Sequence, residues 1–504
     1  MNNQYQEFKE YCGKLKDIAA SIAVMNWDME IYMPKKSGGI RGQQLATLNG
    51  IYHDMVTDQH FGNLMNQLVR DDSLSFEEKK NVEVFLDYYN KEIKFDTEFV
   101  KEKSRLISNA FQSWDEAKKN NDFSLYAPHL KKLVALKRKE AEILGFEDSP
   151  YDALLDQYDK GSTAKQVEAL FDEVRLKLVP FVKLIQEKEQ VNNDIMYRHY
   201  DHQNQWDFGI FLLKQMGYDF DTGRQDLSSH PFTTSFGPQD VRVTTRVKEN
   251  DLAEMIWSCI HEGGHALYEQ GLSMEHYGMP QGEYTSLGIH ESQSRLYENN
   301  VGRSLPYWKY NFSVLKGTFP EQLENEDVDS FYKAMNKVES SLVRTNADEL
   351  TYHFHIMIRF EIEKMLIEGD IEVEDLPRIW NEKYKSYLNI EVPNDAEGVL
   401  QDIHWAHGGF GYFPTYSQGS FYAAQFYAQA KKEMPDLEKQ IENADLKPLK
   451  EWLNKNIHSL GQIYTSDEVC KKVTGESLNF KYFYDYAVEK YSKIYELELL
   501  EKGF

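Results

Sequence analysis

Helical spacing of apolar residues recurs along most of the chain. Residues 167–185 read VEALFDEVRLKLVPFVKLI, and one face of this segment is apolar. The members of that face are Val167, Leu170, Phe171, Val174 and Leu178. Thr163 and Gln166 have the spacing of a capping box and predict where the helix begins. Pro180 lacks a backbone N–H, so we expect it to kink or end the helix.

A second helix is predicted over residues 347–369, ADELTYHFHIMIRFEIEKMLIEG. Its apolar face consists of Leu350, Phe354, Met357 and Ile358. Gly369 can end this helix because glycine readily adopts a positive φ. The C-terminal residues 480–504, FKYFYDYAVEKYSKIYELELLEKGF, are also predicted to be helical.

Strand patterns are few. Residues 238–247, PQDVRVTTRV, have the alternation of a half-buried strand. One face carries Val241, Val243 and Thr245, and the other carries Arg242, Thr244 and Arg246. We expect the preceding FTTSFG, residues 232–237, to pair with this strand as a hairpin.

These patterns predict a mostly α-helical fold with a small β-sheet. We find no Pro/Gly/Ser-rich hinge and no internal repeat, so a single large domain over residues 1–504 is expected. We divide it into an N-terminal helical part (1–200), a catalytic part (201–430) and a C-terminal helical part (431–504). A deep central groove between helical halves is the expected place for a substrate.

Composition and charge narrow the possible partners. The chain has 504 residues, of which 41% are hydrophobic and 28% charged, as in a folded globular protein. Its formal net charge of −25 repels nucleic acid and anionic membrane surfaces, so neither is an expected partner. The distant cysteines Cys12, Cys259 and Cys470 predict no disulfide framework. With neither a signal peptide nor a long apolar run, the expected location is cytoplasmic.

The motif HEGGH at residues 261–265 indicates metal chemistry. His261 and His265 stand four residues apart, so they project from one helix face and can reach one ion. Glu262 lies about 100° further round the helix, where it can act as general base towards a metal-activated water. Gly263 and Gly264 weaken a helix, which makes sense if a backbone or a substrate passes close to them.

A catalytic zinc site needs a third protein ligand and one open position. The segment GIHESQSRLYENN, residues 288–300, offers Glu291, and we favour this residue. The adjacent His290 is the alternative. The plainer interpretations are a chance HExxH on an ordinary buried helix and a solvated surface glutamate.

Six separated motifs together resemble one protein family. They are HPF (230–232), DVRVT (240–244), HEGGHALYEQG (261–271), HESQSR (290–295), VRTNAD (343–348) and GVLQDIHW (398–405). In this combination and order the chain resembles the carboxypeptidase Taq family of thermostable zinc metallocarboxypeptidases. The resemblance spans nearly the whole chain.

The resemblance implies a function and a metal site. It assigns zinc, for which cobalt can substitute, to His261, His265 and Glu291, and the role of general base to Glu262. It implies release of single amino acids from the free C-terminus of peptides, with broad specificity. It also implies a mostly helical, saddle-shaped homodimer with a deep groove.

The remaining site residues also follow from the resemblance. Arg242 and Arg344 occupy the positions of arginines that would bind the substrate's terminal carboxylate, to which a guanidinium can donate two parallel hydrogen bonds. His404 and Tyr416 are the expected donors to the oxyanion, with Tyr412 as the alternative tyrosine and a substrate-binding residue. Asp348 is expected to orient a ligand histidine.

Two other functions stay open on the sequence alone. A related HExxH zinc oligopeptidase or aminopeptidase shares the ligand pattern but would read a different part of the peptide. A non-enzymatic helical protein with a structural zinc is less well supported, because structural zinc sites usually have four protein ligands.

Overall fold

The computed structural model describes residues 3–498, and the chain forms two compact units. Unit 1 consists of Met1–Ile93, Asn192–Met335 and Tyr422–Leu478. Unit 2 consists of Lys94–Val191, Asn336–Phe421 and Asn479–Phe504. The expected single domain, its three-part division and its central groove stay predictions.

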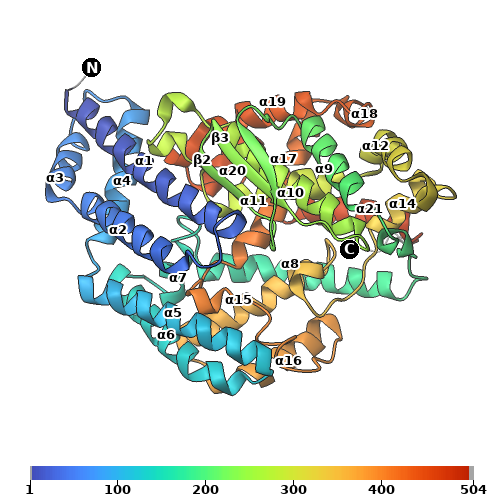
Figure 1. The fold of residues 1–504 in the computed structure, drawn as a ribbon, viewed down its shortest axis with the longest axis horizontal. Coiled ribbons are helices and arrows are strands. Elements are labelled where there is room, and N and C mark those ends of the chain that lie inside the picture. The colour runs from blue at the N-terminus through green and yellow to red at the C-terminus, as the bar shows by residue number, and fades with distance from the viewer. Residues whose placement is uncertain (1–2, 499–504) are drawn as a thin grey trace. The chain divides into compact units, whose positions relative to one another are not determined.

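Unit 1 combines helices from both ends of the chain with a small sheet (Figure 1). Its helices before the sheet are α1 (Asn3–Ile31), α2 (Gly38–Val56), α3 (Gln59–Leu68), α4 (Phe76–Glu92) and α9 (His202–Met216). After the sheet come α10 (Leu252–Gln270), α11 (Leu287–Arg295), α12 (Leu305–Thr318), α13 (Pro320–Leu323), α14 (Val328–Met335), α18 (Leu437–Glu442), α19 (Lys447–Asn456) and α20 (Ser466–Thr474). Helix α17 (Pro414–Glu433) runs through the division between the units.

The sheet has three strands in the order β1-β3-β2. Strands β2 (Thr233–Gly237) and β3 (Asp240–Thr245) form the predicted antiparallel hairpin, with Thr233 opposite Val243. Strand β1 (Gly223–Leu227) pairs in parallel with β3 and was not predicted, because its sequence GRQDL lacks apolar alternation. Val241, Val243 and Thr245 are buried as expected, and Thr244 is buried as well.

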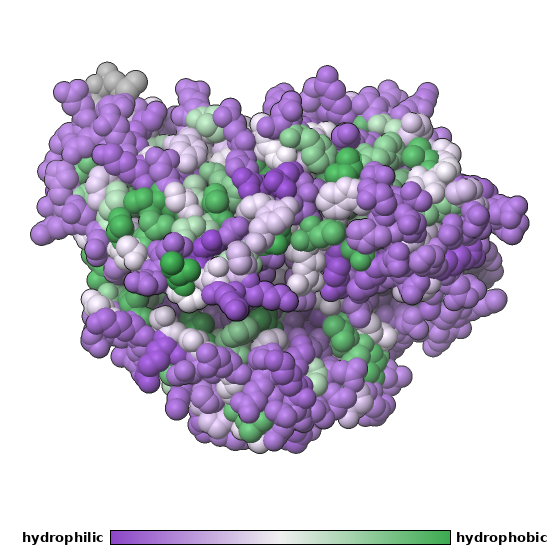
Figure 2. Space-filling view, viewed as in Figure 1, coloured by the Kyte–Doolittle hydropathy of each residue, from purple (hydrophilic) through white to green (hydrophobic). Residues whose placement is uncertain are grey.

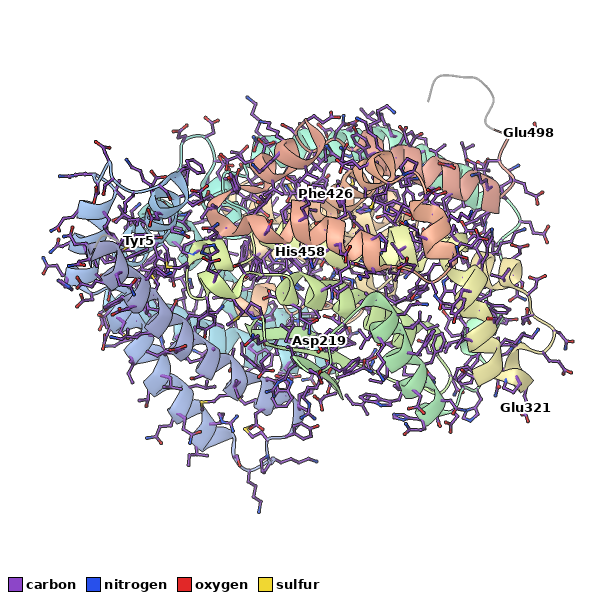
Figure 3. All side chains as sticks on the ribbon, turned by 90° about the horizontal axis from the view of Figure 1, so that it is seen from above. Tyr5, Asp219, Glu321, Phe426, His458 and Glu498 are labelled. Carbon is purple, nitrogen blue, oxygen red and sulfur yellow. The ribbon has the colours of Figure 1, made fainter. Side chains whose placement is uncertain are left out.

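Helix α10 packs against β2 and β3 and lies at the centre of the unit 1 core (Figure 1). It begins after Asp251, whose side chain accepts a hydrogen bond from the backbone N–H of Glu254. Met255 and Ile256 on its buried face belong to the same apolar cluster as Phe426 of α17 (Figure 3). A helix held on several sides is a rigid base for side chains that must keep fixed positions.

The described residues of unit 2 form helices joined by loops, without a strand. It contains α5 (Thr97–Asn120), α6 (Phe123–Leu144), α7 (Pro150–Leu155), α8 (Ala164–Gln186), α15 (Tyr352–Glu368), α16 (Leu376–Leu388) and α21 (Lys481–Ile494). The capping box of Thr163 and Gln166 is present at the start of α8. The helix does not end at Pro180, because Phe181 and Ile185 continue its buried stripe to Gln186.

Helix α15 confirms a second predicted helix and differs from it in two respects. It begins at Tyr352, several residues later than expected, and ends at Glu368, followed by the predicted stop residue Gly369 with a φ of 91°. It is buried on nearly all sides instead of on one face. The predicted C-terminal helix corresponds to α21, and residues 499–504 of that prediction lie outside the described residues.

The fold is mostly α-helical with a small sheet, as predicted. Polar residues dominate the face seen in Figure 2, in keeping with the charged composition. Among residues 3–498, no helix is both long enough and apolar enough to cross a membrane.

Candidate metal centre

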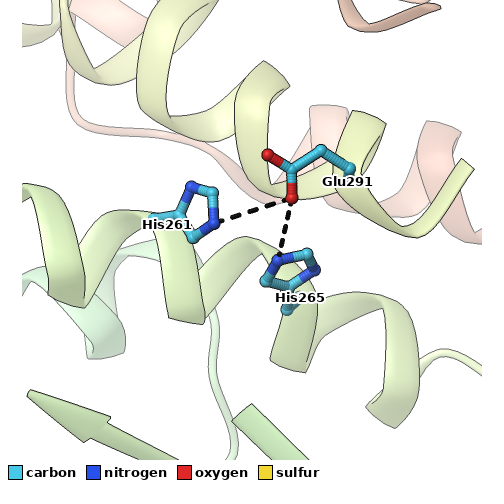
Figure 4. Close-up of side chains that lie close together, drawn as sticks. All are labelled: His261, His265 and Glu291. Atoms are coloured by element: carbon cyan, nitrogen blue, oxygen red, sulfur yellow. Dashed lines mark ion pairs between the residues drawn. The ribbon is translucent and has the colours of Figure 1, made fainter. Parts of the chain in front are cut away.

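Helices α10 and α11 bring the three predicted ligands together (Figure 4). Glu291 Oε2 lies 3.4 Å from His265 Nε2 and 3.8 Å from His261 Nε2. One ligand atom from each residue lies within 4.8 Å of the others. Glu291 is 6% exposed, and the two histidines are half-buried. Two imidazoles and a carboxylate are the donor set that a catalytic zinc ion takes.

The predicted close approach at the glycines is present in the structure. A Cβ on Gly264 would stand 2.6 Å from the Cα of Ser294 and 2.7 Å from the carbonyl oxygen of Gln293. Both atoms belong to the backbone of α11, so Gly264 lets the two helices come close enough for Glu291 to meet the histidines. A Cβ on Gly263 would meet only the ends of the Leu213 and Met216 side chains.

A hydrogen-bonded relay sets the tautomer of His265. Its Nδ1 lies 2.6 Å from Nδ1 of His290, and Nε2 of His290 lies 2.8 Å from the carboxylate of Glu269. The carboxylate only accepts, so Nε2 of His290 donates to it and Nδ1 of His290 accepts from His265. This leaves the lone pair of His265 Nε2 facing the other two ligands, His261 and Glu291, with which His265 forms the metal triad. Because both nitrogens of His290 are engaged, Glu291 is the better third ligand.

His261 is oriented by a second carboxylate. Its Nδ1 donates to Oε2 of Glu298 at 2.8 Å, so its Nε2 also faces the triad with a lone pair. Glu298 lies in the π-helical turn Leu296–Gly302 that follows α11. Arg295 and Arg303 donate to the carboxylate of Glu298, each at 3.1 Å.

The expected orienting role of Asp348 is wrong. The structure gives His261 and His265 other partners, Glu298 and His290. The Asp348 carboxylate instead accepts hydrogen bonds from Leu350 N at 2.8 Å and from the Thr351 hydroxyl at 2.6 Å. It therefore stabilises the backbone just before α15.

Burial and neighbouring charges keep Glu291 and His265 in the forms that bind a metal, whereas the carboxylates beside His261 favour a positive charge at that position. Burial alone would raise the pKa of Glu291, but Arg295 and His261 hold it well below its usual range, so the group is a carboxylate. Burial lowers the pKa of His265 to about 3, which keeps the imidazole neutral. Burial alone would lower the pKa of His261, but Glu291 and Glu298 raise it. These residues therefore fit a divalent cation.

Glu262 is held by strand β2. Its Oε2 lies 2.6 Å from the hydroxyl of Thr233, and it is only 7% exposed. Burial raises the pKa of Glu262. His261 and the hydrogen bond from Thr233 offset part of this rise. A buried carboxylate with a raised pKa next to a metal triad suits a group that accepts a proton during a reaction.

Arg242 is already paired on the sheet. Its Nε and Nη2 donate to the two carboxylate oxygens of Asp240, each at 2.8 Å. Its guanidinium carbon lies 4.3 Å from the ring centroid of Trp27 and 4.9 Å from that of Phe236. The charge of Arg242 is therefore balanced, and two aromatic rings lie against its guanidinium.

Arg344 belongs to a buried cluster in unit 2. Its Nε donates to Oδ1 of Asp402 at 3.1 Å and its Nη1 to the hydroxyl of Tyr352 at 3.1 Å. Arg359, which is fully buried, donates to the other oxygen of Asp402 at 2.6 Å. Two guanidinium groups thus share one carboxylate.

The predicted oxyanion donors lie beside Arg344. His404 Nε2 is 3.3 Å from the hydroxyl of Tyr416, and the guanidinium of Arg344 lies over the Tyr416 ring at 5.2 Å. Tyr412 contacts Tyr416, with 5.2 Å between ring centroids. Burial lowers the pKa of His404 to about 4, so this imidazole is neutral at pH 7.

Sequence reasoning missed the residues that hold the ligands. Glu298 follows Glu291 by seven residues and Arg295 follows it by four, so helical spacing could have linked the three. Glu269 follows His265 by four residues and carries the same kind of signal. Thr233 carries none, because it lies on a strand well before the motif and meets Glu262 only in the folded chain.

Comparison with known proteins agrees with this geometry. The family model described as carboxypeptidase Taq (M32) metallopeptidase matches residues 7–491. Carboxypeptidase 1 of Bacillus subtilis (strain 168) is 37% identical, covering 98% of this chain and 99% of the relative. Thermostable carboxypeptidase 1 of Thermus thermophilus is 36% identical, covering 97% of this chain and 99% of the relative.

A solved structure extends the similarity to the fold. The M32 carboxypeptidase from Deinococcus radiodurans R1 superposes with a TM-score of 0.96 at 37% identity, covering 98% of this chain and 100% of the other. The range of the family model, residues 7–491, includes every residue of the candidate metal centre. The chain belongs to the carboxypeptidase Taq (M32) family of metallopeptidases and is a metallocarboxypeptidase, a peptide hydrolase.

Proposed function

We propose that this enzyme is zinc-dependent and releases single amino acids, with broad specificity, from the free C-terminus of peptides. The observation that carries the proposal is the convergence of His261, His265 and Glu291, with the buried carboxylate of Glu262 on the same helix. Family membership supports hydrolysis at the C-terminal end and argues against a purely structural metal.

His261, His265 and Glu291 would hold the metal through Nε2, Nε2 and Oε2. A divalent zinc ion bound there supplies Lewis-acid chemistry, polarising a carbonyl and lowering the pKa of a water to about 7. Glu298 and His290 keep the imidazoles in the tautomer that can bind. Cobalt, another ion that imidazole and carboxylate ligands accept, would substitute for zinc.

Glu262 is the general base in this proposal. It takes a proton from the attacking water and later delivers it to the leaving amine. Its raised pKa favours this exchange, since a carboxylate of ordinary acidity holds a proton less well at neutral pH. Its Oε1 has no hydrogen-bond partner among residues 3–498, which leaves that oxygen to accept the proton.

Charge balance favours Arg344 over Arg242 as the receptor for the substrate's terminal carboxylate. Arg242 and Asp240 neutralise each other in a two-bond pair. Arg344 and Arg359 share a single carboxylate, Asp402, so their cluster keeps a net positive charge that an incoming anion would balance. The positive charge of this cluster would also offset the repulsion between the substrate's carboxylate and a chain with a net charge of −25.

His404 and Tyr416 are the proposed donors to the oxyanion. The neutral His404 has one N–H and Tyr416 has one O–H. With 3.3 Å between His404 Nε2 and the Tyr416 hydroxyl, one group donates to the other without substrate, and both would turn to the oxyanion when it forms. Tyr412 packs beside Tyr416 and would contact the substrate.

Replacing Glu262 by glutamine tests the reaction. E262Q keeps the shape of the side chain and should lower release of the C-terminal residue from a blocked dipeptide by about 1,000-fold or more, because no base accepts the proton. Metal content, measured on the same sample, should be unchanged. Undiminished turnover by E262Q would end the proposed mechanism.

Amidated substrates separate this function from the related HExxH oligopeptidase and aminopeptidase activities. A carboxypeptidase should cleave a peptide with a free C-terminus and lose most activity on its C-terminal amide. Equal cleavage of both would favour the alternatives. The identity of the metal is tested by chelation and readdition of zinc or cobalt. Homodimer formation and a cytoplasmic location stay predictions.

A further inference from the structure

Strand β2 places hydroxyl groups against the buried glutamates of α10. Thr233 and Ser235 are two residues apart on the strand, so their side chains point to the same face. The Thr233 hydroxyl meets Oε2 of Glu262 at 2.6 Å. A hydrogen bond from Ser235 helps His290 to lower the pKa of Glu269, which burial alone would raise. One strand face therefore meets two carboxylates, one within the HEGGH segment and one four residues after it.

The Thr233 contact restrains one oxygen of Glu262. The hydroxyl has one proton and two acceptors within reach, Oε2 of Glu262 at 2.6 Å and the backbone oxygen of the same residue at 3.0 Å. The shorter contact is to the charged oxygen, which makes the stronger bond. Because Thr233 is β-branched and lies in a paired strand, its side chain has little freedom to turn away.

We propose that Thr233 is a positioning residue for the general base, holding the Glu262 carboxylate by Oε2 so that Oε1 faces the attacking water. This inference rests on the proposed function, since it gives Thr233 a role only through Glu262. Thr233 contacts neither the triad nor the reacting atoms in this role. It acts by reducing the number of orientations that the Glu262 side chain adopts before substrate binds.

Replacing Thr233 by valine removes the hydroxyl and keeps the branched shape. T233V should lower kcat by roughly 10- to 100-fold, the effect of losing one hydrogen bond to a charged group. KM and metal affinity, the latter measured by competition with a chelator, should stay unchanged. T233S restores the hydroxyl and should keep most of the activity. T233A serves as a second hydroxyl-free variant if valine does not fit.

A neighbouring threonine provides the matched control. Thr245 on β3 is fully buried, and its hydroxyl lies 2.7 Å from the hydroxyl of Ser258, also on α10. T245V therefore removes a sheet-to-helix hydroxyl contact that does not involve Glu262. It should leave kcat unchanged even where it lowers the melting temperature.

A double-mutant cycle separates positioning from general destabilisation. If Thr233 acts only through Glu262, T233V should cause no further loss of kcat in the E262Q background. An equal loss in both backgrounds, or an unchanged kcat in T233V alone, would overturn the inference. Either result leaves the proposed function intact as long as E262Q alone lowers turnover by about 1,000-fold to a residual rate that can be measured, so the two failures are distinguishable.

Discussion

Glu291 in unit 1 and Glu363 in unit 2 are both buried carboxylates, but their partners differ in charge. Glu291 accepts a hydrogen bond from Arg295 at 2.6 Å and faces two histidines. Glu363 of α15 is fully buried, and all three of its hydrogen-bond donors are uncharged. They are the Tyr151 hydroxyl at 2.6 Å, the Trp405 indole at 2.7 Å and the Gly411 backbone N–H at 2.9 Å.

The difference in partners moves the two pKa values in opposite directions. Burial raises both, but Arg295 and His261 reverse the effect at Glu291. At Glu363 the neutral donors and the more distant Lys137 offset burial only in part, and the pKa rises to about 7. A carboxylate that must stay charged to bind a metal therefore needs cationic partners. Glu363, which only connects α15 to neighbouring segments through hydrogen bonds, does not need them.

The largest expected effect comes from removing the charge of Glu291. In metal-free protein, E291Q removes the nearer of the two carboxylates to which Arg295 donates, at 2.6 Å against 3.1 Å for Glu298. It should lower the free energy of unfolding by about 3 kcal/mol, because a buried cation loses one of its charged partners. E363Q, at pH 7.5, keeps one acceptor oxygen but turns its NH2 group towards at least one of the neutral donors, and it should cost about 1–2 kcal/mol. Chemical denaturation of both variants measures the difference. Equal costs would show that the charge of the partners does not decide the outcome. E291Q should also fail to retain metal after dialysis.

The second prediction concerns the pH dependence that Glu363 imposes. Its folded-state pKa of about 7 lies above the ordinary value of 4.5, so the folded protein binds this proton more tightly than the unfolded chain. The contribution to stability is fully present below pH 4.5 and is lost as pH rises through 7. The loss is on the order of 3 kcal/mol. E363Q should remove this decline when melting temperatures are compared from pH 5 to pH 8.

Glu140 of α6 provides the control for that experiment. It is also buried, but Lys137 and Lys103 hold its pKa below the usual range although burial alone would raise it. It therefore stays charged in both states from pH 5 to pH 8. E140Q should lower the melting temperature by a similar amount at each pH and leave the slope of the wild-type curve in place.

The two arginine sites extend the comparison from buried acids to substrate binding. R344K keeps the charge but loses the planar fork, and kcat/KM for a free C-terminal peptide should fall roughly 10- to 100-fold. R242K changes an arginine whose charge Asp240 already balances, so its effect should be smaller. The ratio of activities on free and amidated peptides should fall only in R344K. A larger effect in R242K would assign the carboxylate to the sheet of unit 1.

Local spacing explains how much of the site the sequence revealed. His261, Glu262 and His265 lie on one helix, so their arrangement follows from helical geometry. Glu291 could be named because it stands in a short motif after that helix. The helices and the β2–β3 hairpin followed from periodicity in the same way, whereas β1, with no apolar alternation, did not.

Contacts between segments that are distant in the chain could not be predicted from the sequence. Thr233 reaches Glu262 only because β2 packs against α10, and no spacing rule connects the two. Asp348 illustrates the opposite error, since this plausible acid, the last residue of the motif VRTNAD, accepts hydrogen bonds from the backbone of the turn that follows it. Continuation of α8 through Pro180 likewise depended on burial of Phe181 and Ile185, which tertiary packing decides.

The smallest expected effect tests whether packing, as well as charge, sets the triad. A methyl group on Gly264 would meet the α11 backbone at 2.6 Å, so G264A must move α11 and should lower stability by about 1–3 kcal/mol and weaken metal binding. G263A meets only flexible ends of Leu213 and Met216, and alanine's helix propensity offsets part of that strain. Chelator competition and thermal melting compare the two variants. If G263A and G264A lose metal affinity equally, the close approach of α10 and α11 is not what places Glu291, and the charges of Arg295 and the histidines alone hold it there.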